Sequence, residues 1–323
     1  MQAFEHVDAM TAREAVQLLA TDPQARAIAG GTDLIPEMRL GVRCPDRLVN
    51  LKTIRDASGI QELDGYVQIG ALTPLSDVAQ HPLIQSKFPC LVQAILDAAS
   101  PQIRNLATLG GNLCQDSRCW YFRGPFHCWL KGGTYCNAEH GDNRHQAIFG
   151  GGPCFTVHPS DPATALLALR ARLGVIGLDG ERNLSIAQFF VLPHDNHRSL
   201  NCLQPGEVLN RIDLPWPASG ERAIFLKAMD RAAFSFALAS IACVLKLEGE
   251  RINSARVVLG GVAPIPWRAN ACERALIGQT LNDKTIKQAA DLATRGARPL
   301  AMNGYKLPLV RALVERALDQ LAS

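Results

Sequence analysis

Five cysteines fall within one stretch of 41 residues, and this cluster constrains the fold more than any other feature of the sequence. They are Cys114, Cys119, Cys128, Cys136 and Cys154. The segment is rich in Gly, His, Asn and aromatic side chains and follows neither the helical nor the strand period. Loops longer than about 15 residues in a compact domain are usually functional or disordered. Because cysteines and aromatic residues are rare in disordered segments, we expect an ordered, functional insertion here.

The cysteine spacing alone leaves several kinds of site open. Cys119, Cys128, Cys136 and Cys154 are separated by eight, seven and seventeen residues. Buried free thiols are one interpretation, and disulfides are another if the protein is exported. Zinc is a third, although the closely spaced cysteine pairs of common structural zinc sites are missing. A [4Fe–4S] cluster needs four thiolates, and a loop that wraps the cluster allows wide spacing.

The remainder of the chain has the composition of an ordinary globular protein. It has 323 residues, of which 47% are hydrophobic, so two domains are expected. The net charge of +3 is too small for the electrostatic footprint of a nucleic-acid-binding protein. No apolar run is long enough to span a membrane, and the first residues do not have the pattern of a secretory signal. These observations predict a cytoplasmic protein that binds neither nucleic acid nor membrane.

Local patterns outside the insertion predict an α+β protein with a larger N-terminal and a smaller C-terminal domain. Thr11 and Glu14 form a capping box at the start of a short helix. A helix is also predicted over 163–169, and a hairpin around Asp179 and Gly180. Pro and Gly residues concentrate between Leu203 and Gly220, where we expect the domain boundary. Beyond it the expected elements are strands over 223–227, 238–247 and 255–262 and a helix over 307–321. The last two strands flank a turn at Gly249 and Glu250, which predicts a second hairpin.

Two glycine pairs are candidates for an anion-binding site. Gly30 and Gly31 follow a predicted strand, and consecutive amides at such a turn can surround a diphosphate. Gly110 and Gly111 form a second pair about 80 residues later. Neither pair has the Rossmann spacing, and no helix is expected directly after the first one. Each pair alone is more often a simple turn, but together they are consistent with a dinucleotide.

The sequence resembles, motif by motif, the FAD-binding medium subunits of the xanthine oxidase family of molybdenum hydroxylases. The resemblance covers essentially the whole chain and rests on AIAGGTDL, SPQIRNLATLGGNL, HPSD, LKAMDRAAFSFALAS, LGGVAPIPWRA and NGYKLPLVRALVERAL. It implies an FAD domain of the vanillyl-alcohol-oxidase type, made of two α+β subdomains, over residues 1–217. A small domain with a three-stranded antiparallel sheet and helices would follow over 218–323.

The resemblance also implies which residues hold the flavin. The first glycine element and the second would hold the diphosphate and its neighbouring atoms. Asp161 would hydrogen-bond the flavin, and Leu209 and Lys227 fall where the family places further contacts. The full set is Ala27, Ile28, Ala29, Gly30, Gly31, Thr32, Asp33, Leu34, Thr108, Leu109, Gly110, Gly111, Asn112, Asp161, Leu209 and Lys227.

The insertion at about 114–154 is similar to one found in a subset of the family, which includes the FAD subunit of periplasmic aldehyde oxidoreductase and the β subunit of 4-hydroxybenzoyl-CoA reductase. That similarity implies a [4Fe–4S] cluster held by Cys119, Cys128, Cys136 and Cys154, with Cys114 as a spare thiol. It also implies partners, a small subunit with two [2Fe–2S] clusters and a large subunit with the molybdenum cofactor, and an external electron acceptor. A partner with a twin-arginine signal would place the complex in the periplasm instead.

The function expected from the resemblance is electron transfer within a complex that oxidises aldehydes or N-heterocycles. A 4-hydroxybenzoyl-CoA reductase-like enzyme is the alternative within the family. A zinc- or disulfide-stabilised binding module, in which the glycine pairs are only turns, is the alternative of another class. No nucleophile, base and orienting group occur together in a pattern typical of a hydrolase.

Overall fold

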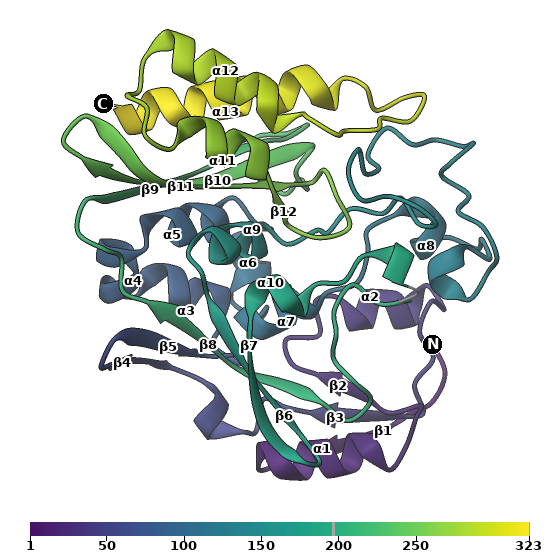
Figure 1. The fold of residues 1–323 in the computed structure, drawn as a ribbon. Coiled ribbons are helices and arrows are strands. Elements are labelled where there is room, and N and C mark those ends of the chain that lie inside the picture. Colours follow the sequence, from purple (N-terminus) through teal and green to yellow (C-terminus); the bar gives the residue numbers. More distant parts are fainter. Residues whose placement is uncertain (196–197, 323) are drawn as a thin grey trace.

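The computed structural model describes residues 1–195 and 198–322, which form three sheets with helices packed around them (Figure 1). The first sheet is parallel, with strand order β1-β3-β2, and lies with helix α1 at the N-terminal end of the molecule. Its bounds are β1 Glu5–Asp8, α1 Ala12–Ala20, β2 Arg26–Ile28, α2 Leu34–Arg39 and β3 Arg47–Asn50. Helix α1 begins as predicted, because the Thr11 side chain accepts a hydrogen bond from the Glu14 amide at 3.1 Å.

The second sheet is antiparallel and has the order β4-β5-β8-β6-β7. Its strands come from both sides of the cysteine-rich insertion, since β5 pairs with β8 although about 140 residues separate them. Hydrophobic side chains from the sheet pack against the helices that cover it. The elements are η1 Arg55–Ala57, β4 Ile60–Leu63, β5 Tyr66–Gly70, α3 Leu75–Gln80, α4 Pro82–Lys87, α5 Pro89–Leu96, α6 Pro101–Arg104, α7 Leu109–Cys114, α9 Asp161–Ala168, β6 Arg172–Gly177, β7 Gly180–Ser185, α10 Ile186–Phe189, η3 Pro193–Asp195 and β8 Val208–Pro215.

The C-terminal part contains an antiparallel sheet, β12-β11-β10-β9, between two layers of helices (Figure 1). Helices α11, α12 and α13 cover one face, and α5 and α9 contact the other. Strand β10 is therefore buried on both faces, which explains its nearly continuous apolar sequence from Ala239 to Leu245. The bounds are β9 Glu221–Ala228, β10 Ala239–Glu248, β11 Arg251–Gly260, β12 Trp267–Arg268, α11 Asn270–Leu276, α12 Asp283–Ala293 and α13 Lys306–Ala322.

The α+β prediction and the C-terminal antiparallel sheet are confirmed, with two differences in detail. The sheet has a fourth strand, β12, which was not expected because it is only two residues long and carries no periodic pattern. A short helix, α2, follows the first glycine pair, where no helix was expected. It has six residues and contains Pro36, so its apolar period is too short to recognise. The hairpins at 179–180 and 249–250 lie where they were predicted.

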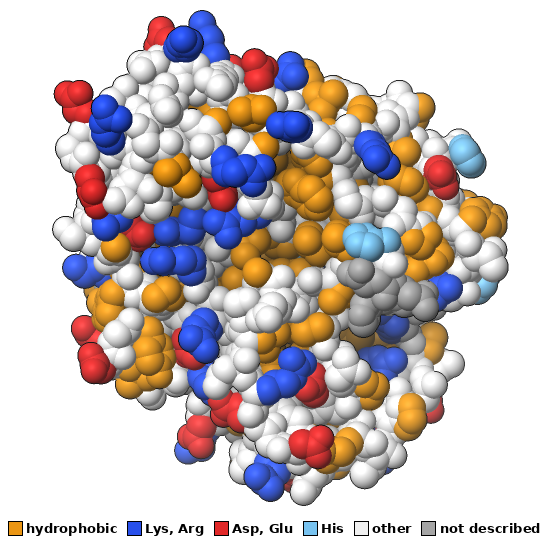
Figure 2. Space-filling model, viewed as in Figure 1, with side chains coloured by type: hydrophobic (Ala, Val, Ile, Leu, Met, Phe, Trp, Pro, Cys, Tyr) orange, Lys and Arg blue, Asp and Glu red, His pale blue; other side chains and the backbone are white. Residues whose placement is uncertain are grey.

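The insertion is ordered by its own contacts and by the domains beside it. It contains only short helical turns, α8 Trp120–Arg123 and η2 Trp129–Lys131. A small apolar core forms around Phe122, Trp129 and Leu130. Figure 2 shows hydrophobic side chains gathered across the middle of this face and over the insertion, while Lys and Arg side chains are scattered among Asp and Glu. No helix in the described residues is long and apolar enough to cross a membrane.

Candidate flavin site and cysteine cluster

The first glycine pair forms a turn whose amides are free to bind an anion. Strand β2 ends at Ile28, whose carbonyl accepts a hydrogen bond from the Leu51 amide at 2.9 Å. From Ala29 to Leu34, no amide donates to a backbone carbonyl of the described residues. Gly31 has φ +68°, a conformation that side chains rarely adopt. Six consecutive unpaired amides at a turn make the kind of concave anion site that phosphates occupy.

The amides around the second glycine pair form hydrogen bonds within the protein. Thr108 caps helix α7 and accepts a hydrogen bond from the Gly111 amide at 3.1 Å. The Leu109 and Gly110 amides donate to Thr73 and Ala71 carbonyls at 2.9 and 2.8 Å. These amides are therefore already paired within the protein. The second pair builds the wall of the site, while the first pair supplies the free donors.

The two glycine elements are brought together by direct backbone contact. A Cβ atom on Gly30 would stand 2.0 Å from the Leu106 carbonyl oxygen and 3.1 Å from the Ala107 Cα. The first turn can therefore approach the chain ahead of α7 only because residue 30 has no side chain. A Cβ on Gly110 would similarly meet the Ala71 backbone at 2.9 Å. The glycines at these two positions are required by packing rather than by flexibility.

Asp161 and Lys227 form a buried ion pair at the side of the site. Ser160 caps helix α9, so Asp161 is its first residue. The Lys227 ammonium lies 2.7 Å from the Asp161 carboxylate and also donates to the Asp97 carbonyl at 2.7 Å. Both side chains are almost completely buried. Burial raises the pKa of Asp161 to about 6, and Lys227 limits that rise by favouring the carboxylate.

A cluster of charged side chains underlies the first glycine turn. Asp33 accepts from Arg123 at 2.7 Å and is paired with Arg118 at 2.9 Å. Glu37 is buried beside Arg123, and burial raises its pKa to about 8, with the nearby Asp116 adding to the effect. The whole cluster consists of Arg26, Asp33, Glu37, Arg43, Asp116, Arg118 and Arg123.

Three of the four candidate cysteine ligands lie near one another. Cys136 and Cys154 influence each other's ionisation, so that the pKa of Cys136 is lowered and that of Cys154 is raised. Backbone amides of Ala138, Glu139 and Phe155 also favour the Cys136 thiolate. Cys119 lies close enough to Cys154 to raise its pKa further.

Cys128 belongs to the apolar core of the insertion, which Cys119 and Cys154 also contact. All ten cysteines are free thiols, so no disulfide staples the insertion. No group of three or more His, Cys, Asp or Glu side chains in the described residues is arranged to hold a single metal ion. A polynuclear cluster differs from a single ion because each of its metal atoms takes only one of the four thiolates. The donor set, buried sulfurs with amides pointing at them, suits that chemistry.

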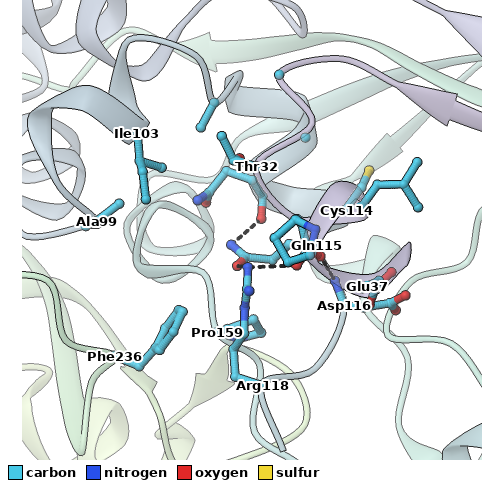
Figure 3. Close-up of a pocket in the computed structure, with 18 of the residues that line it drawn as sticks. Thr32, Glu37, Ala99, Ile103, Cys114, Gln115, Asp116, Arg118, Pro159 and Phe236 are labelled. Atoms are coloured by element: carbon cyan, nitrogen blue, oxygen red, sulfur yellow. Dashed lines mark hydrogen bonds and ion pairs between the residues drawn. The ribbon is translucent and has the colours of Figure 1, made fainter. Parts of the chain in front are cut away.

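A cavity of about 840 Å³ joins the glycine turn, the ion pair and one edge of the cysteine cluster. Figure 3 shows its wall, with Ala99 and Ile103 on one side and Arg118 and Phe236 across from them. Most of the predicted flavin-binding residues line it, and these are Ala27, Ile28, Ala29, Gly30, Gly31, Thr32, Asp33, Leu34, Thr108, Gly111, Asn112, Asp161 and Lys227. Three predicted residues do not reach it. Leu109, Gly110 and Leu209 are buried in the wall behind it.

Sequence reasoning did not single out three cavity-lining residues that the insertion and the β9–β10 connection contribute. Arg118, Gln146 and Phe236 line the cavity, yet none belongs to a glycine or HPSD element. The Arg118 guanidinium lies over the Phe236 ring, and its Cζ is 5.1 Å from the ring centre. The adjacency of Arg118 to Cys119 was the available signal, because a cation next to a cysteine favours a thiolate.

Comparison with known proteins identifies the family. Residues 2–217 match the model of the FAD binding domain in molybdopterin dehydrogenase. The chain belongs to this family. Residues 224–321 match the CO dehydrogenase flavoprotein C-terminal domain. The protein is thus an FAD-binding medium subunit of the molybdenum hydroxylase type.

Individual relatives of this medium subunit align over nearly their whole length. It is 34% identical to the aldehyde oxidoreductase FAD-binding subunit of Escherichia coli, over 99% of this chain and 98% of the relative. It is 26% identical to the glyceraldehyde dehydrogenase medium chain of Sulfolobus acidocaldarius, over 99% and 98%. Its fold matches the solved carbon monoxide dehydrogenase of Hydrogenophaga pseudoflava with a TM-score of 0.79, at 27% identity over 98% and 96%.

Proposed function

We propose that this subunit carries both FAD and a [4Fe–4S] cluster and transfers electrons from its partners to an external acceptor. The observation that supports the proposal is the single cavity, which is lined by the free glycine amides, by the Asp161–Lys227 pair and by Cys119. A cofactor that contacts the first two of these features extends toward the cysteine cluster. The two redox groups would therefore occupy adjoining spaces in one chain.

The residues around the cavity fit FAD by charge and by shape. The amides from Ala29 to Leu34 would donate to the diphosphate, and the arginines of the charged cluster would offset its negative charge. Asp161 would accept hydrogen bonds from the flavin side, and Lys227 would offset negative charge there. Bound FAD supplies a redox group that accepts two electrons and passes them on singly. The chain itself binds and orients this group and excludes water from it.

We place the cluster on Cys119, Cys128, Cys136 and Cys154. Cys119 and Cys136 lie near Cys154, and Cys128 packs in the same small core as Cys119 and Cys154. The match of residues 2–217 to the FAD binding domain in molybdopterin dehydrogenase argues against a stapled binding module. In the wider complex, a small subunit with two [2Fe–2S] clusters and a large molybdenum subunit would deliver the electrons.

For the complex as a whole, oxidation of an aldehyde or an N-heterocycle is the proposed reaction. The 34% identity to an aldehyde oxidoreductase subunit favours the aldehyde. A reductase acting on an aromatic CoA thioester, with electrons flowing inward, is the second candidate within the same architecture. We place the boundary between the FAD domain and the C-terminal domain at 217/218, in the connection between β8 and β9.

Spectroscopy and metal analysis test the proposal. The purified chain should show flavin bands over a broad iron–sulfur absorption and contain about four irons per FAD. Changing Cys128 to Ser should remove the iron while FAD remains, because Cys128 lies in the insertion core and does not line the cavity. Cys114→Ser is the matched control and should keep its iron. A colourless protein with zinc and no iron would refute both cofactors, and a Cys128→Ser variant with full iron would refute the ligand set.

A further inference from the structure

Cys119 is the one candidate cluster ligand that faces the cavity. Cys128, Cys136 and Cys154 do not line it, whereas Cys119 and its neighbour Trp120 do. If the proposed cofactors are present, Cys119 is the ligand nearest the flavin compartment. A side chain that contacts the Cys119 sulfur would therefore change the free energy of electron transfer between the flavin and the cluster.

The Gln146 side chain touches this sulfur. Its Nε2 donates to the Cys119 Sγ at 3.4 Å, and the residue is only 2% exposed. A thiolate or cluster-bound sulfur offers no proton, so it pairs with the NH₂ end of the amide and not with its oxygen. The amides of Tyr121 and Phe122 also point at this sulfur, but they belong to the backbone of the adjoining turn. Gln146 is therefore the side chain through which this contact can be altered.

The C-terminal domain holds Gln146 in place. The buried Asn303 side chain donates to the Gln146 carbonyl at 3.1 Å, and its own oxygen accepts from the Leu300 amide at 2.7 Å. Next to it, the buried Lys306 ammonium donates to the carbonyls of His145 and Gly261 at 3.0 and 2.6 Å. The backbone on both sides of the Gln146 side chain is thus fixed from a different domain.

We propose that Gln146 is a positioning residue that raises the reduction potential of the cluster by donating to Cys119. The inference rests on the proposed cluster. Reduction adds one electron to the cluster and makes its sulfurs more negative, so a donor to sulfur stabilises the reduced form more than the oxidised form. A hydrogen bond to a charged group is stronger than one between neutral groups, and part of its strength differs between the two states. Removing it should change the reduction equilibrium roughly tenfold, which corresponds to about 59 mV for one electron.

Redox titration of the full-length chain, purified in the complex it forms, tests this proposal. Dithionite supplies the electron in the presence of mediators, and the reduced cluster is followed by electron paramagnetic resonance. Gln146→Met keeps the length of the side chain and removes the donor, so its cluster should titrate at a lower potential. Gln85→Met is the matched control, because Gln85 also donates through its Nε2, to the Ala79 carbonyl at 3.0 Å, and does not line the cavity. Its cluster potential should equal that of the wild type.

Iron content separates the possible failures. A wild-type chain without iron would refute the proposed cluster itself. An iron-loaded Gln146→Met variant with an unchanged potential would overturn only the role of Gln146. If that variant loses iron, Gln146→Glu keeps the size of the side chain and replaces the donor with an acceptor. The equilibrium constant for reduction of its cluster should fall by more than tenfold, so the potential should be lower than in the wild type. An unchanged potential would overturn the inference.

Discussion

Replacing Gly30 with alanine tests whether the two glycine elements form one site. The added Cβ would lie 2.0 Å from the Leu106 oxygen and 2.6 Å from the Leu106 carbonyl carbon. Nonbonded carbon atoms prefer separations of about 3.5–4.0 Å, so the first turn must retreat by more than about 1 Å. The atoms in the way belong to the backbone and cannot rotate aside. Overpacking of this kind costs about 1–3 kcal/mol, or about 3–10 °C in the melting temperature of a domain this large.

The displacement should also weaken cofactor binding, since it moves the free amides of the turn. Loss of one hydrogen bond to a charged phosphate is equivalent to about 1.5–3 kcal/mol, which is tenfold or more in affinity. Thermal unfolding of the FAD-free chain measures the first effect. Titration of that chain with FAD, followed by flavin fluorescence, measures the second.

Gly41→Ala is the control for the backbone conformation alone. Gly41 has φ +70°, similar to the value at Gly31, but a Cβ there meets nothing within 4 Å. It should lose only the roughly 1–2 kcal/mol of a left-handed residue and keep normal FAD affinity. If Gly30→Ala binds FAD as tightly as Gly41→Ala does, the close approach of the two elements does not build the site and the reasoning fails.

Two further predictions concern buried charge. Lys227→Met leaves the Asp161 carboxylate buried without its cation and should destabilise the chain by about 3–5 kcal/mol at pH 8, measured by denaturant unfolding. The loss of unfolding free energy should be smaller at pH 5, where Asp161 binds a proton. Adding Asp161→Asn to Lys227→Met should recover most of the lost stability. An equal loss at both pH values would contradict the assignment of a buried Asp161–Lys227 ion pair. Glu37 has a pKa of about 8 in the folded chain against its usual 4.5, so its folded form holds a proton that the unfolded form releases. Stability due to this proton is complete below about pH 4.5 and is lost as pH rises to about 8, with a slope of at most about 1.4 kcal/mol per pH unit. Glu37→Gln should flatten that part of the profile, and identical profiles for wild type and variant would show that Glu37 is already ionised.

Local signals in the sequence predicted those parts of the fold that depend on neighbours in the chain. The capping box at Thr11 and the two hairpins depend on residues at most a few positions apart, and each lies where it was expected. The glycine turn is equally local, since free amides after a strand follow from the Gly-Gly pair itself. Local reasoning did not indicate the tertiary contacts at the second glycine pair, where the Leu109 and Gly110 amides donate to the Thr73 and Ala71 carbonyls.

The contacts that complete the site join residues far apart in the sequence, and no sequence motif predicted them. Asp33 and Arg123 are 90 positions apart, and Asp161 and Lys227 are 66 apart. Each pair depends on how the sheets and the insertion pack, and a single charged residue in a sequence does not indicate its partner. Lys227 and Asp161 were candidates through the family resemblance only. Arg123 and Glu37 were not candidates at all.

The charges beneath the glycine turn show that the insertion belongs to the flavin site as well as to the cysteine cluster. Four arginines face three carboxylates there, a net charge of +1 when all are ionised. Protonation of Glu37, whose pKa is about 8, makes the net charge +2 at neutral pH, and this would offset the two negative charges of a bound diphosphate. Two of the four arginines, Arg118 and Arg123, lie in the insertion. Two cations of the insertion therefore lie beneath the glycine turn, which connects the insertion to the flavin site independently of the proposed cluster.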